Sequence, residues 1–362
     1  MNIAILAHLH YPIAQPYVGG LESHTAHLAY ELQRQGHQVT LYAAKGSDKN
    51  LNTVSIFEGD ALGGNNTMIE LAYHWAVNQI KAADYDFVIN NTLNPVPVQL
   101  LSKTNIPTLT IFHTPPLPKL VKAIKQIDLT GAPDTLRYAA VSSLTAGQWK
   151  QATGMFVETI YNGIAIGNTK LPNVQERVGS GYLVWSGRIT PEKGTHIAIR
   201  AAHLAGMPLK LIGSIYDKTY FNNVVQPLLA CTRTQYLGHV DQRTIRKVYQ
   251  DASVALVTPL WDEPFGLVIV EALLSGTPVA ALPNGAVAEI LSPKTGHIAD
   301  NSTPEALAKA ITIARTKNPR YCVELVRSKY SLDRMARDYV SLMHPLLASG
   351  QKKQKIWMPV PA

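Results

Sequence analysis

The chain has 362 residues, of which 46% are hydrophobic and 16% are charged, and it carries a formal net charge of +8 at pH 7. The composition is that of a folded globular protein, and the length exceeds what a single hydrophobic core usually organises, so two domains are expected. No run reaches the roughly 18 uninterrupted apolar residues that a membrane-spanning helix needs.

The amino-terminal stretch and the cysteines indicate the compartment. The opening MNIAILAHLHYP has no basic leader ahead of its short apolar run, so it predicts a first strand rather than a secretory signal peptide. Cys231 and Cys322 have neither the spacing of a metal site nor the partners of a disulfide framework, which fits a reducing compartment. The protein is therefore expected to be cytoplasmic.

The positive charge is spread along the chain, apart from the segment QKKQKIW at residues 351–357. A basic protein suits anionic partners, but the sequence has neither a zinc-finger spacing nor an aromatic and basic RNA-binding motif, so nucleic acid is not expected. The basic tail allows peripheral contact with an anionic membrane surface without requiring it, and a solvated chain end is the simpler interpretation. The oligomeric state cannot be predicted from these features.

In chain order, the first half alternates short apolar runs with helical patterns, which is typical of a parallel sheet covered by helices. A helix is expected from about Leu21 to Gln35, with Gly36 as its terminator. The strands expected in this half are residues 3–8, 38–44, 86–91, 108–113 and 138–143.

The polar stretch GNTKLPNVQERVGSG has the Gly, Pro and Asn content of a linker, and the alternation restarts after it. The expected organisation is an α/β fold of two Rossmann-like, doubly wound domains that face an interdomain cleft, with ligands at the carboxyl ends of the strands. The domains are predicted at residues 1–165 and 166–345, followed by a basic tail at 346–362. The second half is expected to contain strands at residues 182–189, 209–214, 234–240, 253–259 and 277–283, and helices at residues 195–206 and 244–252.

The stretch WDEPFGLVIVEALLSG at residues 261–276 predicts a buried helix that begins near Gly266 and ends at Ser275. Glu271 lies on this largely apolar helix, where an unpaired charge costs several kcal/mol or shifts its pKa. Two arrangements offset that cost: a structural ion pair, or ligand hydroxyls that hydrogen-bond to the carboxylate as a ribose does in dinucleotide sites.

Glu263 precedes the same helix, whose first four backbone N–H groups lack helical partners and whose dipole is positive at this end. The amides near Phe265, Gly266 and Leu267 could therefore receive a phosphate, and Gly266 allows a close backbone approach. The simpler alternative is that Glu263 only stabilises the positive end of the helix.

These residues resemble the E-x7-E element of the retaining glycosyltransferases of family 4, which have the GT-B fold. The element is EPFGLVIVE, and further similarities follow in the family's order along nearly the whole chain. They are VGG (18–20), IYNGI (160–164), WSGRITPEKG (185–194), YLGHV (236–240) and SGTPVAA (275–281).

The resemblance implies a nucleoside diphosphate sugar as donor. Arg188 and Lys193 would neutralise its diphosphate without a metal ion or another cofactor, since fixed cations can stabilise the leaving group. Glu263 would contact the transferred sugar, Glu271 would hold the ribose, and the amides of residues 265–267 would meet the sugar and the phosphates. If the resemblance is set aside, Arg188 and Lys193 could belong to a solvated loop.

In the first half, the resemblance assigns Gly19 and Gly20 to a loop close to the diphosphate or the acceptor, and His113 to a position near the transferred sugar. A ligand-free Gly-Gly turn and a structural histidine are the respective alternatives. The sequence departs from the family at Ala286, where a second glycine is more usual. The DYD triplet at residues 84–86 suggests a turn before a strand rather than a metal site.

The resulting hypothesis is a retaining hexosyltransferase that moves a sugar, best assigned as glucose from UDP-glucose, to an acceptor hydroxyl. The stretch at residues 7–25, together with residues 212–229, also resembles bacterial glucosyltransferases that act on small molecules. The alternatives are a non-catalytic sugar-nucleotide-binding protein and a sugar-nucleotide epimerase of the same fold. An oxidoreductase fits less well, because no G-x-G-x-x-G follows the first strand.

Overall fold

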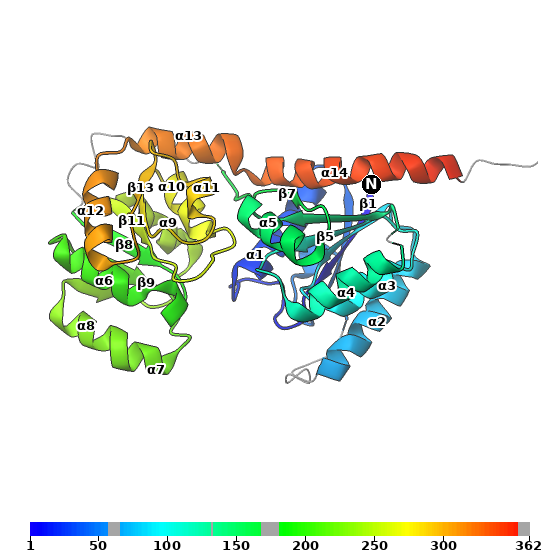
Figure 1. The fold of residues 1–362 in the computed structure, drawn as a ribbon, viewed down its shortest axis with the longest axis horizontal. Coiled ribbons are helices and arrows are strands. Elements are labelled where there is room, and N and C mark those ends of the chain that lie inside the picture. Colours follow the sequence, from blue (N-terminus) through cyan, green and yellow to red (C-terminus); the bar gives the residue numbers. More distant parts are fainter. Residues whose placement is uncertain (57–65, 132, 168–180, 354–362) are drawn as a thin grey trace, which may run out of the picture. The chain divides into compact units, whose positions relative to one another are not determined.

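The structure, a computed structural model, describes residues 1–56, 66–131, 133–167 and 181–353, so most of the predicted linker and the end of the basic tail lie outside the described residues. The chain forms two compact units (Figure 1). One unit comprises Met1–Tyr161 and the helix that begins at Leu332, and the other comprises Asn162–Ser331. The predicted boundaries, by contrast, were residue 165 and residue 345.

The first unit contains a seven-stranded sheet with the strand order β3-β2-β1-β4-β5-β6-β7, and all its paired strands are parallel. The inner strands are buried on both faces, which explains why their sequences are continuous apolar runs rather than alternating ones. The strands are β1 (Asn2–Ala7), β2 (Gln38–Ala43), β3 (Thr53–Ser55), β4 (Phe87–Asn91), β5 (Thr108–Phe112), β6 (Leu136–Ala140) and β7 (Glu158–Thr159).

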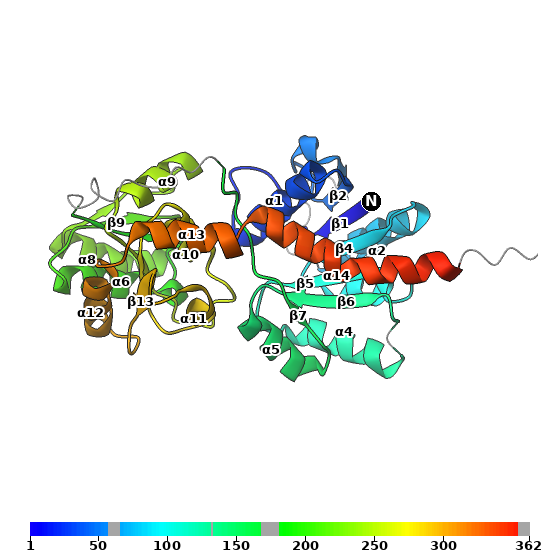
Figure 2. The same cartoon turned by 90° about the horizontal axis from the view of Figure 1, so that it is seen from above.

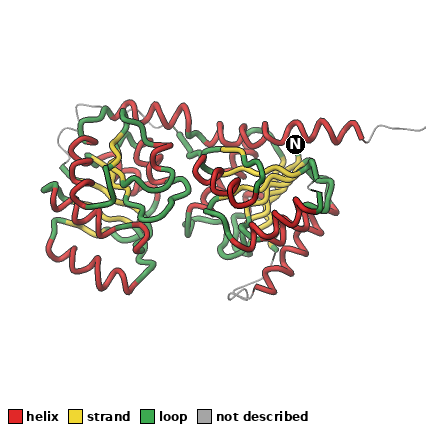
Figure 3. The backbone as a smooth tube through the Cα atoms, in the orientation of Figure 1, coloured by secondary structure: helices red, strands yellow, loops and turns green. Residues whose placement is uncertain are grey.

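Helices flank both faces of this sheet, as the tube in Figure 3 shows. They are α1 (Gly20–Arg34), α2 (Asn66–Ala82), α3 (Pro95–Leu101), α4 (Pro118–Leu129), α5 (Ser143–Thr153) and α14 (Leu332–Lys353), with a short 3-10 helix at Lys49–Leu51. The α14 helix packs against α1 (Figure 2). Its side chains Met335, Tyr339 and Met343 are fully buried, which accounts for its return to the first unit.

The second unit has a six-stranded parallel sheet with the order β10-β9-β8-β11-β12-β13. Its strands are β8 (Leu183–Ser186), β9 (Leu209–Ile212), β10 (Thr234–Tyr236), β11 (Val254–Val257), β12 (Val279–Ala281) and β13 (Gly296–Ile298). Its helices are α6 (Thr195–Leu204), α7 (Lys218–Tyr220), α8 (Gln226–Cys231), α9 (Gln242–Asp251), α10 (Leu267–Leu274), α11 (Val287–Ile290), α12 (Pro304–Ala314) and α13 (Pro319–Lys329). A 3-10 helix at Pro191–Lys193 and a π-helical turn at Phe221–Val225 complete this unit.

Each sheet reverses its strand order beside its first strand. β1 lies between β2 and β4, and β8 lies between β9 and β11. In open parallel sheets, ligands bind at such a reversal, outside the carboxyl ends of the strands. The segments that follow β1, β4, β8 and β11 are therefore the places where the fold favours a binding site. None of the helices in the described part of the chain is long and apolar enough to cross a membrane.

Candidate active site

Arg188 lies in the loop that follows β8, next to Ile189, which is fully buried. The loop is fixed by hydrogen bonds from Gly187 N to Ile212 O at 3.0 Å and from Ile189 N to Ser214 O at 2.9 Å. Because its neighbour is anchored in the core, the exposed Arg188 side chain projects from the carboxyl edge of the sheet, where its Cζ lies 5.1 Å from the ring centroid of Tyr216.

Lys193 ends the 3-10 helix after that loop and is held by its backbone. Its carbonyl accepts a hydrogen bond from Thr258 Oγ1 at 2.8 Å, and that hydroxyl in turn accepts one from Trp185 Nε1 at 2.8 Å. The following Gly194 has φ +65°, and a Cβ there would lie only 2.2 Å from Thr258 O. Thr258 comes directly after β11, so this contact fixes Lys193 against the neighbouring strand.

The ammonium of Lys193 forms an ion pair with the carboxylate of Glu263. The same carboxylate oxygen accepts a hydrogen bond from Trp261 Nε1 at 3.0 Å, and Lys193 Nζ lies 5.2 Å from the Trp261 ring centroid. Both charged side chains are mostly buried, with 20% of Lys193 and 17% of Glu263 exposed. The structure thus brings together two of the predicted residues and adds Trp261, which the sequence analysis did not single out.

The segment after β12 packs closely against the backbone of Glu263. Its carbonyl accepts a hydrogen bond from Ala286 N at 2.9 Å, and a Cβ on Gly285 would lie 2.3 Å from Glu263 N. Gly285 has φ +69°. The close contact with the backbone of Glu263 is therefore made at Gly285. Ala286, which stands where the family more usually has a second glycine, contributes its amide.

Gly266 immediately precedes α10 with φ +88°, a left-handed conformation that favours glycine. It has no side chain with which to cap the helix, so the amides of Leu267 and Val268 are available to a ligand, whereas Ile269 N donates to Gly266 O at 2.9 Å. Phe265 is buried and lies 6.0 Å, centroid to centroid, from the ring of Tyr330. This packing anchors the start of the helix.

Glu271 lies in the middle of α10 and is half-buried. Burial raises the pKa of its carboxyl to about 7, and the positive charge of Arg246 only partly opposes that rise. Among the described residues, no cation lies within ion-pair distance of the carboxylate. Of the two arrangements predicted from the sequence, the structural ion pair is therefore not found, and the carboxylate remains able to accept hydrogen bonds from a ligand.

In the first unit, Gly19 precedes α1 in an extended conformation, and Gly20 is the first residue of the helix. A Cβ on Gly19 would lie 3.1 Å from Glu22 Oε2, so the glycine makes room for this carboxylate. Glu22 is 5% exposed and pairs with His8 Nε2 at 3.0 Å. Burial raises the pKa of Glu22, but the hydrogen bond from His8 and those from the backbone amides of Glu22 and Gly19 outweigh it, and the net pKa is lowered.

His113 follows β5 and is locked into a buried polar network. Its Nε2 hydrogen-bonds to Asn91 Oδ1, and Asn91 Nδ2 donates to Thr25 Oγ1 at 2.8 Å and to His24 Nδ1 at 3.3 Å. Burial, together with the nearby His24 and His8, holds the pKa of His113 well below its ordinary value. His113 is therefore a neutral imidazole whose Nε2 carries the proton.

The predicted site residues thus form two groups, each described within its own unit. Arg188, Lys193, Glu263 and the start of α10 lie at the carboxyl ends of the adjacent strands β8 and β11. Gly19, Gly20 and His113 lie at the carboxyl edge of the first sheet. Asp86 of the DYD triplet accepts a hydrogen bond from Asn2 N at 2.7 Å beside the start of β4, as expected of a turn.

Comparisons with known proteins assign this architecture. The sequence model for glycosyl transferases group 1 matches residues 169–327, and the model for glycosyltransferase family 4 matches residues 18–167. Two Rossmann-like parallel α/β units with these matches define a GT-B glycosyltransferase. The chain belongs to the family-4 type of these enzymes.

Relatives and solved structures agree with that assignment. A phosphatidyl-myo-inositol mannosyltransferase of Mycobacterium leprae is 25% identical over 93% of this chain and 96% of its own length. An uncharacterized glycosyltransferase of Methanocaldococcus jannaschii is 26% identical over 51% of this chain and 53% of its own length, so the chain matches about half of that protein.

Among solved structures, sucrose-phosphate synthase of Thermosynechococcus elongatus has a TM-score of 0.80 at 19% identity, covering 96% of this chain and all of that one. Anabaena HepE in complex with UDP and glucose has a TM-score of 0.71 at 19% identity, covering 95% of this chain and all of that one. At these identities the structural matches establish the fold.

Proposed function

We propose that the protein is a retaining, metal-independent hexosyltransferase that moves glucose from UDP-glucose to an acceptor hydroxyl. The observation that carries this proposal is the cluster of Lys193, Glu263 and Trp261 at the start of α10, on the same sheet edge as Arg188. The solved complexes of Anabaena HepE with UDP, with UDP and glucose, and with UDP-glucose support the choice of donor.

The cluster matches the charge changes of the reaction. When the glycosidic bond breaks, the nucleoside diphosphate gains negative charge, and preorganised cations and amides stabilise such charge best in a site that excludes water. Arg188, Lys193 and the amides at the start of α10 would perform that role on the diphosphate. Glu263 would then accept hydrogen bonds from the transferred sugar, with its carboxylate held by Trp261 Nε1.

Retention in this assignment requires attack on the front face of the sugar, because no side chain is given the role of a nucleophile. Glu263 is engaged by Lys193 and Trp261, so we assign it to positioning rather than to attack. The acceptor hydroxyl would enter on the face from which the diphosphate leaves, and a leaving phosphate oxygen would take its proton. No proton-accepting side chain is then needed, which also suits the neutral His113 with its Nε2 proton already committed to Asn91.

Glu271 lies further along the same helix and would hold the two hydroxyls of the donor ribose. In the part of the chain that the structure describes, its carboxylate has no ion-pair partner. Such a charge on a largely apolar helix is costly in isolation, and hydroxyl donors from a ligand would offset that cost. The raised pKa fits this environment, because bound hydroxyls would favour the ionised form and lower the pKa again.

A donor screen tests the proposed function. The purified protein is incubated with UDP-, GDP- and ADP-sugars, with and without EDTA, and release of nucleoside diphosphate is followed. Release from UDP-glucose that survives EDTA is expected, and the anomer of the isolated product should match that of the donor. A strict metal requirement, or an inverted product, would refute the mechanism. Binding without turnover for any acceptor would favour a non-catalytic role, and an epimerised donor would reveal an epimerase.

Two variants test whether the reaction depends on the cluster of Lys193, Glu263 and Trp261. Lys193→Ala and Glu263→Gln should each lower kcat by about a hundredfold or more, as removal of a transition-state contact typically does. Lys294→Ala is the matched control, because Lys294 is an exposed lysine of the same unit. Full turnover by both cluster variants, with melting temperatures like the control, would refute the assignment.

A further inference from the structure

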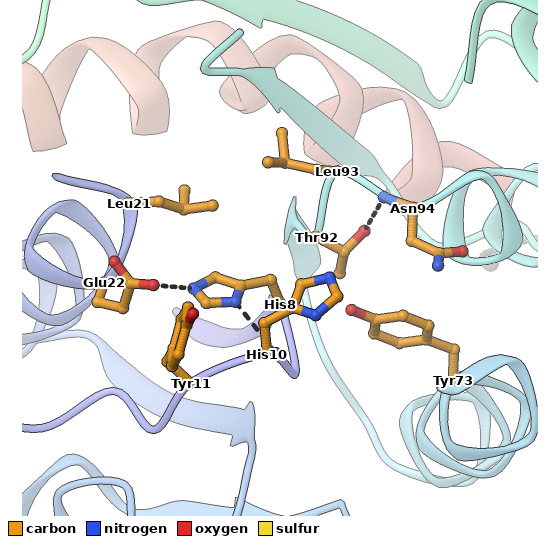
Figure 4. A pocket seen from close by; sticks show the side chains of 9 residues that line it. All are labelled: His8, His10, Tyr11, Leu21, Glu22, Tyr73, Thr92, Leu93 and Asn94. Atoms are coloured by element: carbon orange, nitrogen blue, oxygen red, sulfur yellow. Dashed lines mark hydrogen bonds and ion pairs between the residues drawn. The ribbon is translucent and has the colours of Figure 1, made fainter. Parts of the chain in front are cut away.

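A pocket of about 360 Å³ opens in the first unit, at the point where its strand order reverses (Figure 4). His8, His10 and Tyr11 reach it from the segment after β1, and Thr92, Leu93 and Asn94 reach it from the segment after β4. The first turn of α1 and Tyr73 of α2 complete the wall. Its position is where open parallel sheets bind ligands, and its volume lies near the lower end of the roughly 300–1,000 Å³ of small-molecule sites.

The backbone is strained where it borders the pocket. Leu93 has φ +58° and is one of two non-glycine residues with positive φ in the described part of the chain. Leucine rarely adopts this conformation, and a strained residue of this kind is over-represented at ligand sites. Hydrogen bonds of the next residue, Asn94, fix the backbone around Leu93. Asn94 N donates to Thr92 Oγ1 at 3.3 Å, and Asn94 Oδ1 accepts from Val96 N at 2.9 Å.

The charge of the pocket is the property that selects a ligand. Among the described residues that line the pocket, Glu22 is the acidic one and none is a lysine or an arginine. The start of α1 would ordinarily attract an anion, but the Glu22 carboxylate already lies there, with Oε2 3.1 Å from the position that a Cβ on Gly19 would take. A phosphate or carboxylate that entered would meet a fixed negative charge with no cation of the lining to balance it, apart from any proton taken up by a histidine.

The two ring nitrogens of His8 face partners inside the protein rather than a ligand. Nδ1 accepts a hydrogen bond from His10 N at 3.3 Å, and Nε2 lies 3.0 Å from a carboxylate oxygen of Glu22 (Figure 4). The groups that remain for a ligand are uncharged or aromatic. They are the exposed ring of His10, the 41% exposed ring of Tyr11, the hydroxyl of Tyr73 and the Asn94 Nδ2 amide.

We propose that this pocket binds an uncharged, hydroxyl-bearing part of the acceptor, of about monosaccharide size, and rejects acceptors whose bound part carries a phosphate or a carboxylate. The hydroxyls would exchange hydrogen bonds with Asn94, Tyr73 and His10, and the apolar face of the ring would lie on Tyr11. This inference rests on the proposed glycosyltransfer only in naming the ligand an acceptor.

The test compares neutral and phosphorylated members of matched pairs. Glucose with glucose 6-phosphate, and myo-inositol with myo-inositol 1-phosphate, are titrated against the full chain in the presence of UDP, and binding is followed by saturation-transfer NMR. The neutral member of at least one pair should bind, and its phosphate should bind at least about tenfold more weakly. Equal or tighter binding of the phosphates, or no binding by either neutral probe, overturns the proposal.

Charge variants locate the selectivity in the pocket. Tyr11→Lys places a cation at the exposed rim and should reduce the discrimination against glucose 6-phosphate, and Glu22→Gln should do the same if the variant folds. Leu129→Lys is the control, because it adds the same charge to the same unit at a residue that is 85% exposed and outside the pocket lining. An equal change in Tyr11→Lys and Leu129→Lys overturns the assignment.

The two proposals can fail separately, because this measurement needs no turnover. Selective binding of a neutral probe by a protein that releases no UDP from UDP-glucose would retain the pocket inference and refute the transferase mechanism. Turnover of UDP-glucose with a preference for phosphorylated acceptors would retain the transferase mechanism and refute the pocket inference.

Discussion

Replacing Gly285 with alanine tests whether the loop after β12 holds Glu263 in its working position. The new Cβ would lie 2.3 Å from Glu263 N, 2.5 Å from Glu263 O and 2.8 Å from Glu263 Cα, all of them backbone atoms that no rotamer change can move away. Ordinary Cβ contacts begin at 3.4 Å, so one of the two segments must move by about 1.1 Å to relieve the shortest contact. The carboxylate of Glu263 would move with its backbone, away from Lys193 and Trp261.

A displacement of that size has two separable costs. Alanine at a positive φ costs roughly 1–2 kcal/mol of stability wherever it occurs. A reacting group misplaced by about 1 Å can lower the rate about a hundredfold, or close to 3 kcal/mol in the activation free energy. Gly206→Ala isolates the first cost, because Gly206 has φ +64° in the same unit and nothing lies within 4 Å of the position its Cβ would take.

The assay measures kcat/KM from UDP release and stability from urea unfolding for the two variants and the parent protein. Gly206→Ala should lose stability but keep its turnover, whereas Gly285→Ala should lose about a hundredfold in kcat/KM under conditions where it remains folded. If Gly285→Ala retains kcat/KM within about threefold of Gly206→Ala, the backbone of Glu263 does not need this support, and the role given to its carboxylate is wrong.

Two further predictions concern buried polar groups. The carboxyl of Glu271 has a pKa near 7 in the folded chain and 4.5 as its ordinary value, so its ionisation destabilises the fold increasingly as pH rises from about 4.5 to 7. Relative to the parent, Glu271→Gln should therefore be more stable by an amount on the order of 3 kcal/mol at pH 8 but not at pH 4 in urea unfolding, and a pH-independent difference would contradict this reasoning. Asn91→Leu should leave His113 Nε2 without its acceptor and cost about 1–3 kcal/mol for that unsatisfied group, whereas Thr25 Oγ1 still donates to Leu21 O at 2.8 Å. In the parent protein, the ¹⁵N signals of His113 should not titrate near pH 6.5, because burial holds its pKa well below that ordinary value.

Most of the fold could be predicted from local patterns. Strands buried on both faces have continuous apolar sequences, so β4, β5 and β11 were expected within a few residues of their observed bounds. The helix of the E-x7-E stretch begins at Leu267 because Gly266 can adopt φ +88°, which agrees with the expected start near Gly266. Both the buried strands and the start of this helix depend on residues close together in the chain, so they can be predicted from a single sequence.

The assignment of α14 to the first unit could not be predicted in the same way. An apolar stripe through Met335, Tyr339 and Met343 indicates that a helix must be buried, but it does not indicate which surface covers it. The partner is α1, some 300 residues earlier, where Arg34 also pairs with Asp333 at 3.1 Å. Only the tertiary structure brings these segments together, so the predicted boundary at residue 345 had no such contact to guide it.

The same distinction applies within the candidate site. Arg188, Lys193 and Glu263 were predicted because a family motif contains them, and motifs list residues without their contacts. The supports of Glu263 are Trp261, two residues earlier, and Gly285, twenty-two residues later. The sequence does contain a signal for Trp261. Its indole N–H is a hydrogen-bond donor two residues from Glu263, an acidic side chain whose position the proposed chemistry requires to be fixed. Gly285 directly precedes Ala286, the position at which the sequence departs from the family.

The ion pair between Lys193 and Glu263 links the stability of this site to its proposed chemistry. Each charge is largely desolvated, and a lone buried charge would cost more than the pair does, so the two side chains are stable only while each has a partner. A donor diphosphate would give Lys193 a new anionic partner, and the hydroxyls of the transferred sugar would give Glu263 new donors in addition to Trp261. The site can therefore exchange one internal pairing for two pairings with the donor without leaving either charge unsatisfied. Under the proposed function, replacing either Lys193 or Glu263 by an uncharged side chain would therefore weaken donor recognition.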